Sequence, residues 1–305
     1  MALHDIDPYP WFLNKNLDLI VNERIVHTRT TASEWAEHWR PFLGHLRDLW
    51  LAHFPRRFVI AIAGPPGAGK SLLAEHLHWI IDRGFLHRDA HSIALPMDGF
   101  HYSNAYLESH TRKLPDGGEI KLSSVKGEAD TIDLARFRKY VQALLQRPEY
   151  LSWPAYSRYT HDVVPEKFLI HTSVNLVILE GTYLLVNRGH FTGLPDLYDV
   201  RVYVDAPAPK IVANLVERHI AGGKSIDQAK EWVKRIDLPN ARIAEASKPM
   251  ADVVIEKDSD NDIADVVWIR KGPGTPAPPD AGPAPAPAIA PENPLPPLGQ
   301  PQPNA

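Results

Sequence analysis

Short apolar runs alternate with amphipathic stretches along most of the chain, beginning at Arg57. Continuous apolar runs of this length are typical of strands that are buried on both faces of a parallel sheet. Four runs predict strands, at Phe58–Ala63, Ser92–Met97, Asn175–Leu179 and Val200–Val204. Apolar residues at helical spacing predict helices around residues 73–81, 134–145 and 212–219. We therefore predict an α/β fold of three layers with a mostly parallel sheet.

The segment before this pattern has a different character. From Ser33 to His53, aromatic and aliphatic residues recur at helical spacing with charges between them, whereas residues 1–30 show no clear pattern. Pro41 is expected to divide this helix or to begin its second piece. We predict that residues 1–54 form an N-terminal helical extension whose aromatic stripe packs on the main domain. A stripe that faces a partner is the alternative.

The end of the chain is rich in proline. Residues 272–305 hold 13 of the 29 prolines, mixed with alanine and glycine and with few large apolar side chains. Such a segment buries too little surface to offset the entropy of ordering it. We predict a folded domain over residues 55–271 and a disordered Pro/Ala-rich tail over 272–305.

Composition and charge exclude several classes of protein. The 305 residues carry a net charge of −4 and include no cysteine, so disulfides and thiolate chemistry are excluded. The slight acidity argues against nucleic-acid binding, which needs clustered basic charge. No apolar run approaches the roughly 18 residues of a membrane span. The start carries Asp5 and Asp7 where a signal peptide needs basic charge, so we predict a cytoplasmic protein without membrane contact.

One motif carries most of the chemical information. It follows the first predicted strand, precedes a predicted helix, and fits G-x-x-x-x-G-K-[ST] with the residues Gly64, Pro65, Pro66, Gly67, Ala68, Gly69, Lys70 and Ser71. Glycine lets the backbone close around an anion, so that successive N–H groups point at phosphates. The lysine adds a positive charge at the transferring phosphoryl group, and the serine hydroxyl completes a Mg²⁺ site. The sequence therefore predicts a P-loop NTPase fold that binds ATP and Mg²⁺.

The second predicted strand ends in the sequence Asp98-Gly99-Phe100-His101. The carboxyl ends of neighbouring parallel strands meet at the edge where open α/β sheets bind ligands. An aspartate there can accept the proton of a hydroxyl group while its oxygen attacks phosphorus. GTP-binding switch proteins are excluded, because no N-K-x-D follows the loop. Motor-type ATPases usually end their central strand in Asp-Glu, whereas the strand 175–179 is followed by a single acid, Glu180.

These motifs resemble those of the P-loop kinases grouped as pantothenate kinase, uridine kinase and phosphoribulokinase, and especially their nucleoside/nucleotide-kinase-like members. The resemblance rests on Gly64–Ser71, on Asp98–His101 and on Leu179–Gly181, and covers roughly residues 57–257. It implies a small mobile lid. It also implies that Asp98 is the catalytic base and that Glu180 joins Ser71 in holding magnesium.

The resemblance further assigns the lid arginine and the acceptor side. Arg218 is expected to fold over the γ-phosphate, with Lys224 and Arg235 as substitutes. The expected acceptor-binding residues are His101, Lys126, Tyr156, Arg158 and His161. Pantothenate kinases tend to have histidine where Arg158 stands and tyrosine where His161 stands, so the acceptor differs from a plain pantothenate pocket. The role of Asn240 stays open between ligand contact and helix capping.

The sequence thus predicts an ATP- and Mg²⁺-dependent kinase that phosphorylates a hydroxyl group of a small metabolite, such as a sugar, a nucleoside or a pantothenate-like alcohol. The alternative is a regulatory protein that binds ATP, hydrolyses it slowly and acts through its terminal segments. A homodimer is left open.

Overall fold

The computed structural model describes residues 6–114, 117–258 and 262–269, and its centre is a six-stranded sheet. The strands run in the order β12-β11-β10-β3-β9-β4, and all neighbours are parallel except the antiparallel pair β11 and β12. Their bounds are β3 Phe58–Ala63, β4 Ser92–Pro96, β9 Leu176–Glu180, β10 Val200–Asp205, β11 Val253–Lys257 and β12 Ile263–Trp268. The four strands predicted from apolar runs are all confirmed.

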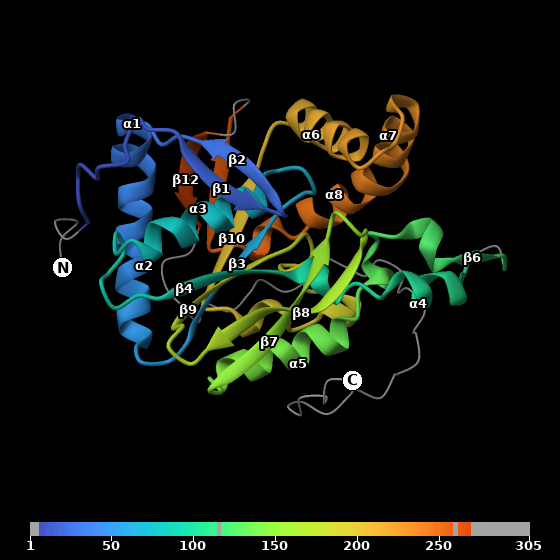
Figure 1. Ribbon diagram of the computed structural model, residues 1–305, viewed down its shortest axis with the longest axis horizontal. Helices are drawn as coiled ribbons and strands as arrows, with labels where there is room; N and C mark the ends of the chain where they lie inside the picture. The colour runs from blue at the N-terminus through green and yellow to red at the C-terminus, as the bar shows by residue number, and fades with distance from the viewer. Residues whose placement is uncertain (1–5, 115–116, 259–261, 270–305) are drawn as a thin grey trace, which may run out of the picture.

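Helices cover both faces of this sheet, which gives the predicted three layers (Figure 1). The longer ones are α2 Arg40–His53, α3 Lys70–Asp82, α5 Leu134–Leu145 and α6 Ala208–Ala221. The shorter ones are α1 Ala32–Glu34, α4 Asn104–Ser109, α7 Ile226–Trp232 and α8 Leu238–Glu245. Two π-helical turns, Trp35–Trp39 and Val233–Asp237, join α1 to α2 and α7 to α8.

Three two-stranded hairpins complete the described chain, and the sequence patterns did not predict them. They pair β1 Leu17–Val21 with β2 Arg24–Thr28, β5 Thr111–Lys113 with β6 Glu119–Lys121, and β7 Tyr150–Ser157 with β8 Asp162–His171. The first changes the picture of the N-terminal extension, which holds a β-hairpin as well as the predicted helix. Pro41 lies in the first turn of α2, so it begins the second helical piece, as expected.

Strand β3 shows how the sheet divides the core. All six of its residues are buried, and successive side chains point to opposite faces. Phe58, Ile60 and Ile62 join one apolar cluster, whereas Val59, Ala61 and Ala63 join another. Both faces are therefore apolar, and polar side chains collect where the strands end.

The N-terminal extension belongs to the first of these clusters. Trp35, Trp39 and Leu46 are buried in the same cluster as Phe58 and Ile60 of the sheet. The predicted packing of the aromatic stripe on the main domain is therefore confirmed. The predicted tail over 272–305 lies outside the described residues. None of the helices in the described part of the chain is both long and apolar enough to cross a membrane.

Two leucines of α2 test whether the extension shares the core of the domain. Leu46 is fully buried, whereas Leu51 is 40% exposed. Leu46→Ala is expected to lower the free energy of unfolding by about 3 kcal/mol, since it leaves a cavity. Leu51→Ala should cost less than about 1 kcal/mol. Urea denaturation measures both, and equal losses in the two variants would contradict a shared core.

Candidate active site

The phosphate loop and two acidic residues, Glu180 and Asp98, meet at the carboxyl ends of β3, β9 and β4. The order of the sheet places β9 between the other two strands, so Glu180 at its end lies between the loop after β3 and Asp98 after β4. Backbone registers pair Glu180 with Ile62 on one side and with Pro96 on the other. The predicted convergence of these segments is thus present in the fold.

The loop itself depends on glycine at two places. Gly64 has φ +145°, and a Cβ there would collide with the backbone carbonyl of Val204 on β10. Gly69 caps α3 with φ +88°, a left-handed conformation that L side chains rarely adopt. These backbone positions let the chain turn sharply from β3 into α3, which leaves the helix N-terminus facing the cavity.

Lys70 and Glu180 are charged groups buried within this turn. Lys70 and Glu180 are each less than a tenth exposed. The Lys70 ammonium donates a hydrogen bond of 2.8 Å to the carbonyl of Pro65. Burial lowers the pKa of Lys70 to about 8, while the nearby Glu180 carboxylate opposes that shift. Burial and the Asp98 charge raise the pKa of Glu180, and a hydrogen bond from Ser71 opposes this. The protonation state of Lys70 and that of Glu180 therefore each depend on the other charged groups of the site.

This set of groups fits a divalent cation. Ser71, Glu180 and Asp98 offer only oxygen atoms, which Mg²⁺ prefers, and two of them are carboxylates whose charges repel. Mg²⁺ typically takes few protein ligands and keeps waters or substrate phosphates. No group of three or more His, Cys, Asp or Glu side chains among the described residues forms a metal cage of its own.

A cavity of about 720 Å³ opens in front of these groups. Twelve of the residues predicted to form the site line it: Pro66, Gly67, Gly69, Lys70, Ser71, Asp98, His101, Lys126, Tyr156, Arg158, His161 and Arg218. The other four predicted residues, Gly64, Pro65, Ala68 and Glu180, are not in its wall. Glu180 lies beneath the cavity and contacts Ser71.

Hairpin β7–β8 brings the acceptor-side residues to Asp98. A Cβ at Gly99 would collide with the backbone of Pro154, so the hairpin lies directly against the Asp98 turn. The indole of Trp153 also donates a hydrogen bond of 3.0 Å to the carbonyl of Pro96. As a result, the Arg158 guanidinium lies 4.0 Å from the Asp98 carboxylate.

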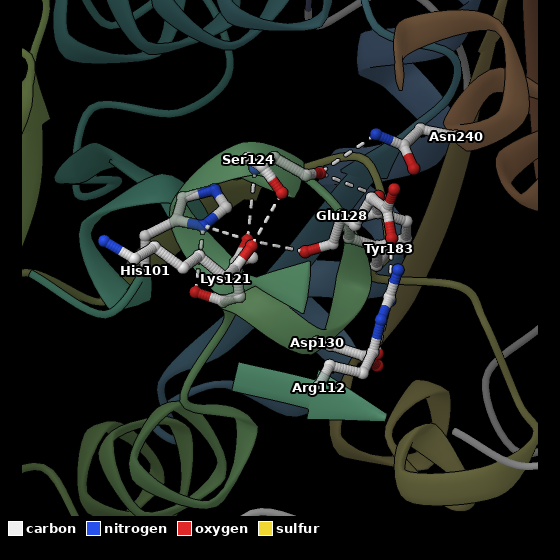
Figure 2. A network of polar contacts seen from close by, with 10 residues as sticks. His101, Arg112, Lys121, Ser124, Glu128, Asp130, Tyr183 and Asn240 are labelled. Carbon is white, nitrogen blue, oxygen red and sulfur yellow. Dashed lines mark hydrogen bonds and ion pairs between the residues drawn. The ribbon is translucent and has the colours of Figure 1, made fainter. Parts of the chain in front are cut away.

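Figure 2 shows a network of polar contacts around the loop after residue 125. Tyr183 and Asn240 both donate hydrogen bonds of 3.0 Å to the carbonyl of Gly127. Nδ1 of His101 lies 3.1 Å from the carbonyl of Thr131, so it carries the proton and donates. Burial lowers the pKa of His101, which favours a neutral ring with Nε2 free to accept. Asn240 thus anchors this loop while it also lines the cavity.

Lys126 and His161 of the acceptor side are in direct contact. The Lys126 ammonium donates a hydrogen bond of 2.7 Å to the carbonyl of His161 and lies 4.8 Å from the centre of the Tyr156 ring. His161 has φ +53°, and its ring lies near Gly222 at the end of α6. These three side chains therefore form one connected wall between the hairpin and the lid segment.

The three candidate lid cations differ in their surroundings. Arg218 lines the cavity and donates a hydrogen bond of 3.1 Å to Asp237, whose other oxygen lies 2.7 Å from His219. Lys224 also lines the cavity. Arg235 is absent from the wall and lies 5.4 Å from the centre of the Trp232 ring.

Several wall residues were not anticipated from the sequence. Thr182 and Tyr183 follow directly after the Glu180-Gly181 pair, so their position near that motif was an available signal. Asn214 and Glu217 lie on the same helix as Arg218. The hairpin residues Val21, Asn22, Arg24 and Val26 come from a segment without a readable pattern.

Comparison with known proteins gives a consistent result. Residues 59–264 match the model of the Phosphoribulokinase / Uridine kinase family. The chain is 28% identical to the protein YggC of Escherichia coli over 241 residues, which cover 79% of this chain and 94% of the relative. It is 29% identical to a pantothenate kinase of Listeria monocytogenes, with 70% of this chain and 73% of the relative covered.

A solved structure gives a similar picture. The chain is similar to a protein of Silicibacter sp. TM1040 described as a "putative fructose transport system kinase", with a TM-score of 0.59 and 29% identity. The similarity covers 70% of this chain and 98% of that chain.

The buried lysine predicts a pH-dependent affinity for ATP. In the free protein Lys70 is charged below its pKa of about 8 and loses its proton as the pH rises through that value. A neutral amine no longer attracts phosphate, so the dissociation constant for ATP should rise about tenfold per pH unit above 8. Isothermal titration calorimetry between pH 7 and 9.5 measures this.

Lys70→Arg is the matched control, because a guanidinium keeps its charge over this pH range. The slope of affinity against pH should be flat in this variant, whatever its absolute affinity. The same slope in wild type and variant would show that another group titrates.

Proposed function

We propose, starting from the fact that this chain belongs to the Phosphoribulokinase / Uridine kinase family, that it transfers the γ-phosphoryl group of ATP to a hydroxyl group of a small metabolite. Family membership makes the chain a small-molecule kinase. The alcohol acceptor and the roles of individual residues are our proposal. One observation carries it: Asp98 and the phosphate loop line the same cavity at the carboxyl edge of one sheet.

The donor side is assigned to the phosphate loop. Backbone N–H groups of residues 67–71 and the Lys70 ammonium would bind the phosphates of ATP. Ser71 and Glu180 would hold Mg²⁺, which would neutralise charge on the phosphates. The apolar faces of the sheet beneath these groups strengthen their attraction, because charges interact more strongly away from water.

Asp98 is proposed as the base that receives the proton of the acceptor hydroxyl. Its side chain is 42% exposed at the cavity, so a small molecule can reach it. The Arg158 guanidinium lies 4.0 Å from this carboxylate, so both groups can meet the same acceptor molecule. Neutral His101 offers a further hydrogen-bond acceptor for a hydroxyl group of the same molecule.

The lining of the cavity supports the proposed class of acceptor. Arg158, Lys126 and His161 suit a molecule with several oxygen atoms, such as a sugar, a nucleoside or a pantothenate-like alcohol. Relatives carry the names "Putative uridine kinase C227.14" and "Pantothenate kinase", which support an alcohol as acceptor. Residues 55–271 are proposed as the catalytic domain. The proposed use of ATP as phosphate donor is in keeping with a cytoplasmic location.

The test is ATP turnover with a panel of pantothenate, uridine, fructose and ribulose phosphate. Turnover that depends on an acceptor supports the kinase. Slow ATP hydrolysis that none of these changes would point to the regulatory alternative.

Asp98→Asn is expected to lower kcat by about 100- to 10,000-fold, since an amide cannot accept the proton. ATP affinity should be nearly unchanged, because the phosphate loop is intact. Asp89→Asn is the control, as Asp89 is 60% exposed before β4 and outside the cavity wall. Full turnover in Asp98→Asn would remove the base assignment.

The lid cations can be separated by a pair of substitutions. Arg218→Ala is expected to lower kcat by about 100-fold or more, since it removes a cation that stabilises charge on the transferring group. Arg235→Ala should change kcat little, because its guanidinium lies against Trp232 and outside the cavity wall. Steady-state kinetics with the best acceptor, alongside thermal unfolding of both variants, measures the difference. A larger loss in Arg235→Ala would transfer the role to that residue.

A further inference from the structure

The N-terminal hairpin β1–β2 contributes to the wall of the cavity, although it lies outside the residues that match the family model. The match covers residues 59–264, whereas Val21, Asn22, Arg24 and Val26 of the hairpin line the cavity. Figure 1 shows the hairpin beside α3, with its turn directed toward the part of the molecule that holds α6 and α8. This segment is therefore part of the site.

The turn of this hairpin has an unusual sequence for its shape. Val21 pairs with Arg24, so the turn consists of Asn22 and Glu23 alone, with φ angles of +49° and +67°. Two-residue turns with both φ angles positive favour Asn-Gly, because glycine has no Cβ to crowd the backbone. A glutamate in the second position is disfavoured by local sterics and is held by contacts outside the hairpin.

Those contacts reach the turn between β7 and β8. One carboxylate oxygen of Glu23 accepts a hydrogen bond of 2.9 Å from the Ser157 hydroxyl and one of 3.1 Å from the backbone N–H of Arg158. The other oxygen lies 3.6 Å from the Lys167 ammonium. The hydrogen bond from Ser157 lowers the pKa of Glu23, so the side chain is a carboxylate at neutral pH.

Ser157 passes this constraint to the rest of the turn. Its hydroxyl donates to Glu23 and accepts hydrogen bonds from the N–H groups of Tyr159 and Thr160, at 3.2 and 3.3 Å. Residues 157–160 therefore fold around one hydroxyl that Glu23 orients. Ser157 is itself buried, so water does not replace Glu23 without cost.

The same turn carries the central cation of the acceptor side. The Arg158 guanidinium lines the cavity 4.0 Å from Asp98, and its charge acts on Lys70, His101 and Arg218. On the other side of the hairpin turn, Arg24 donates a hydrogen bond of 3.4 Å to the carbonyl of Ala221 at the end of α6. The hairpin thus touches both the acceptor-side turn and the lid segment.

We propose that Glu23 is a positioning residue that fixes the turn 157–160 and so holds Arg158 beside Asp98 for binding of the acceptor. This inference rests on the proposed function, because it gives Arg158 an acceptor to bind. Glu23 acts through Arg158 and does not touch the reacting atoms. The hairpin is, in this view, the element with which this chain completes the acceptor side of its site.

The first measurement needs no acceptor. Hydrogen–deuterium exchange followed by mass spectrometry compares wild type with Glu23→Ala, Glu23→Gln and Asp18→Asn. Asp18 is the matched control, since it lies on the same hairpin, pairs with His27 and is 65% exposed. Glu23→Ala is expected to raise exchange in peptides that cover residues 157–160 about tenfold or more. The Arg158 N–H loses its acceptor, and the Ser157 hydroxyl, which accepts from the N–H groups of the next two residues, loses the group that orients it. Peptides that cover 64–71 should be unchanged.

The second measurement uses whichever of pantothenate, uridine, fructose and ribulose phosphate the wild type phosphorylates. Glu23→Ala should raise the KM for that acceptor about tenfold and leave the KM for ATP within about twofold. Glu23→Gln, which keeps an oxygen acceptor of the same shape, should recover most of the acceptor affinity. Asp18→Asn should match the wild type.

Two results would overturn the inference. One is unchanged exchange at residues 157–160 in Glu23→Ala. The other is a parallel rise of both KM values, which would indicate a general loss of structure. If the wild type phosphorylates none of the four compounds, the proposed function fails instead, and the exchange data still decide whether Glu23 fixes the turn.

Discussion

A carboxylate that is buried at the end of strand β9, Glu180, sets the main physical constraint on this site. Its strand β9 lies between the strand that leads into the phosphate loop and the strand that leads to Asp98. A buried carboxylate needs a compensating charge in a low-dielectric setting, and Lys70 at the start of α3 supplies it. The Ser71 hydroxyl adds a hydrogen bond. The loop geometry and the sheet order bring these groups and Asp98 to the same edge of the sheet.

Balance between buried charges also explains why the cavity needs elements from distant parts of the sequence. Lys70 and Glu180 compensate one another, so Asp98 and its partner Arg158 form a second pair at the cavity surface. Arg158 reaches this place only because the β7 strand passes against Gly99. Glu23 in turn holds the backbone of Arg158. A chain of short contacts thus connects the N-terminal hairpin to the phosphate loop.

The sheet and the phosphate loop could be predicted from the sequence because local physics determines both. Strands buried on two faces must be apolar throughout, as β3 and β9 are. The loop needs glycine where its backbone is left-handed or crowded, as at Gly64 and Gly69. The hairpin β1–β2 lacked such signals. Its strands are half exposed, with Ile20 and Ile25 on the solvent side, so the alternation of polar and apolar residues is blurred. Its turn is Asn22-Glu23, whereas the sequence Asn-Gly would have predicted a two-residue hairpin turn.

The positive charge of the cavity wall also could not be predicted from the sequence. The whole chain has a net charge of −4, which gives no hint of a site for a polyanion. The cavity wall, however, holds six lysine and arginine side chains (Arg24, Lys70, Lys126, Arg158, Arg218 and Lys224) against three acids (Asp98, Glu217 and Asp237). Hydrogen bonds to neutral carbonyl oxygens orient Lys126 and Lys70 without neutralising them. The positive potential is therefore created by folding, which gathers cations from the hairpin, the loop and the lid segment around one space. This space suits an anionic ligand even though the net charge of the whole chain is negative.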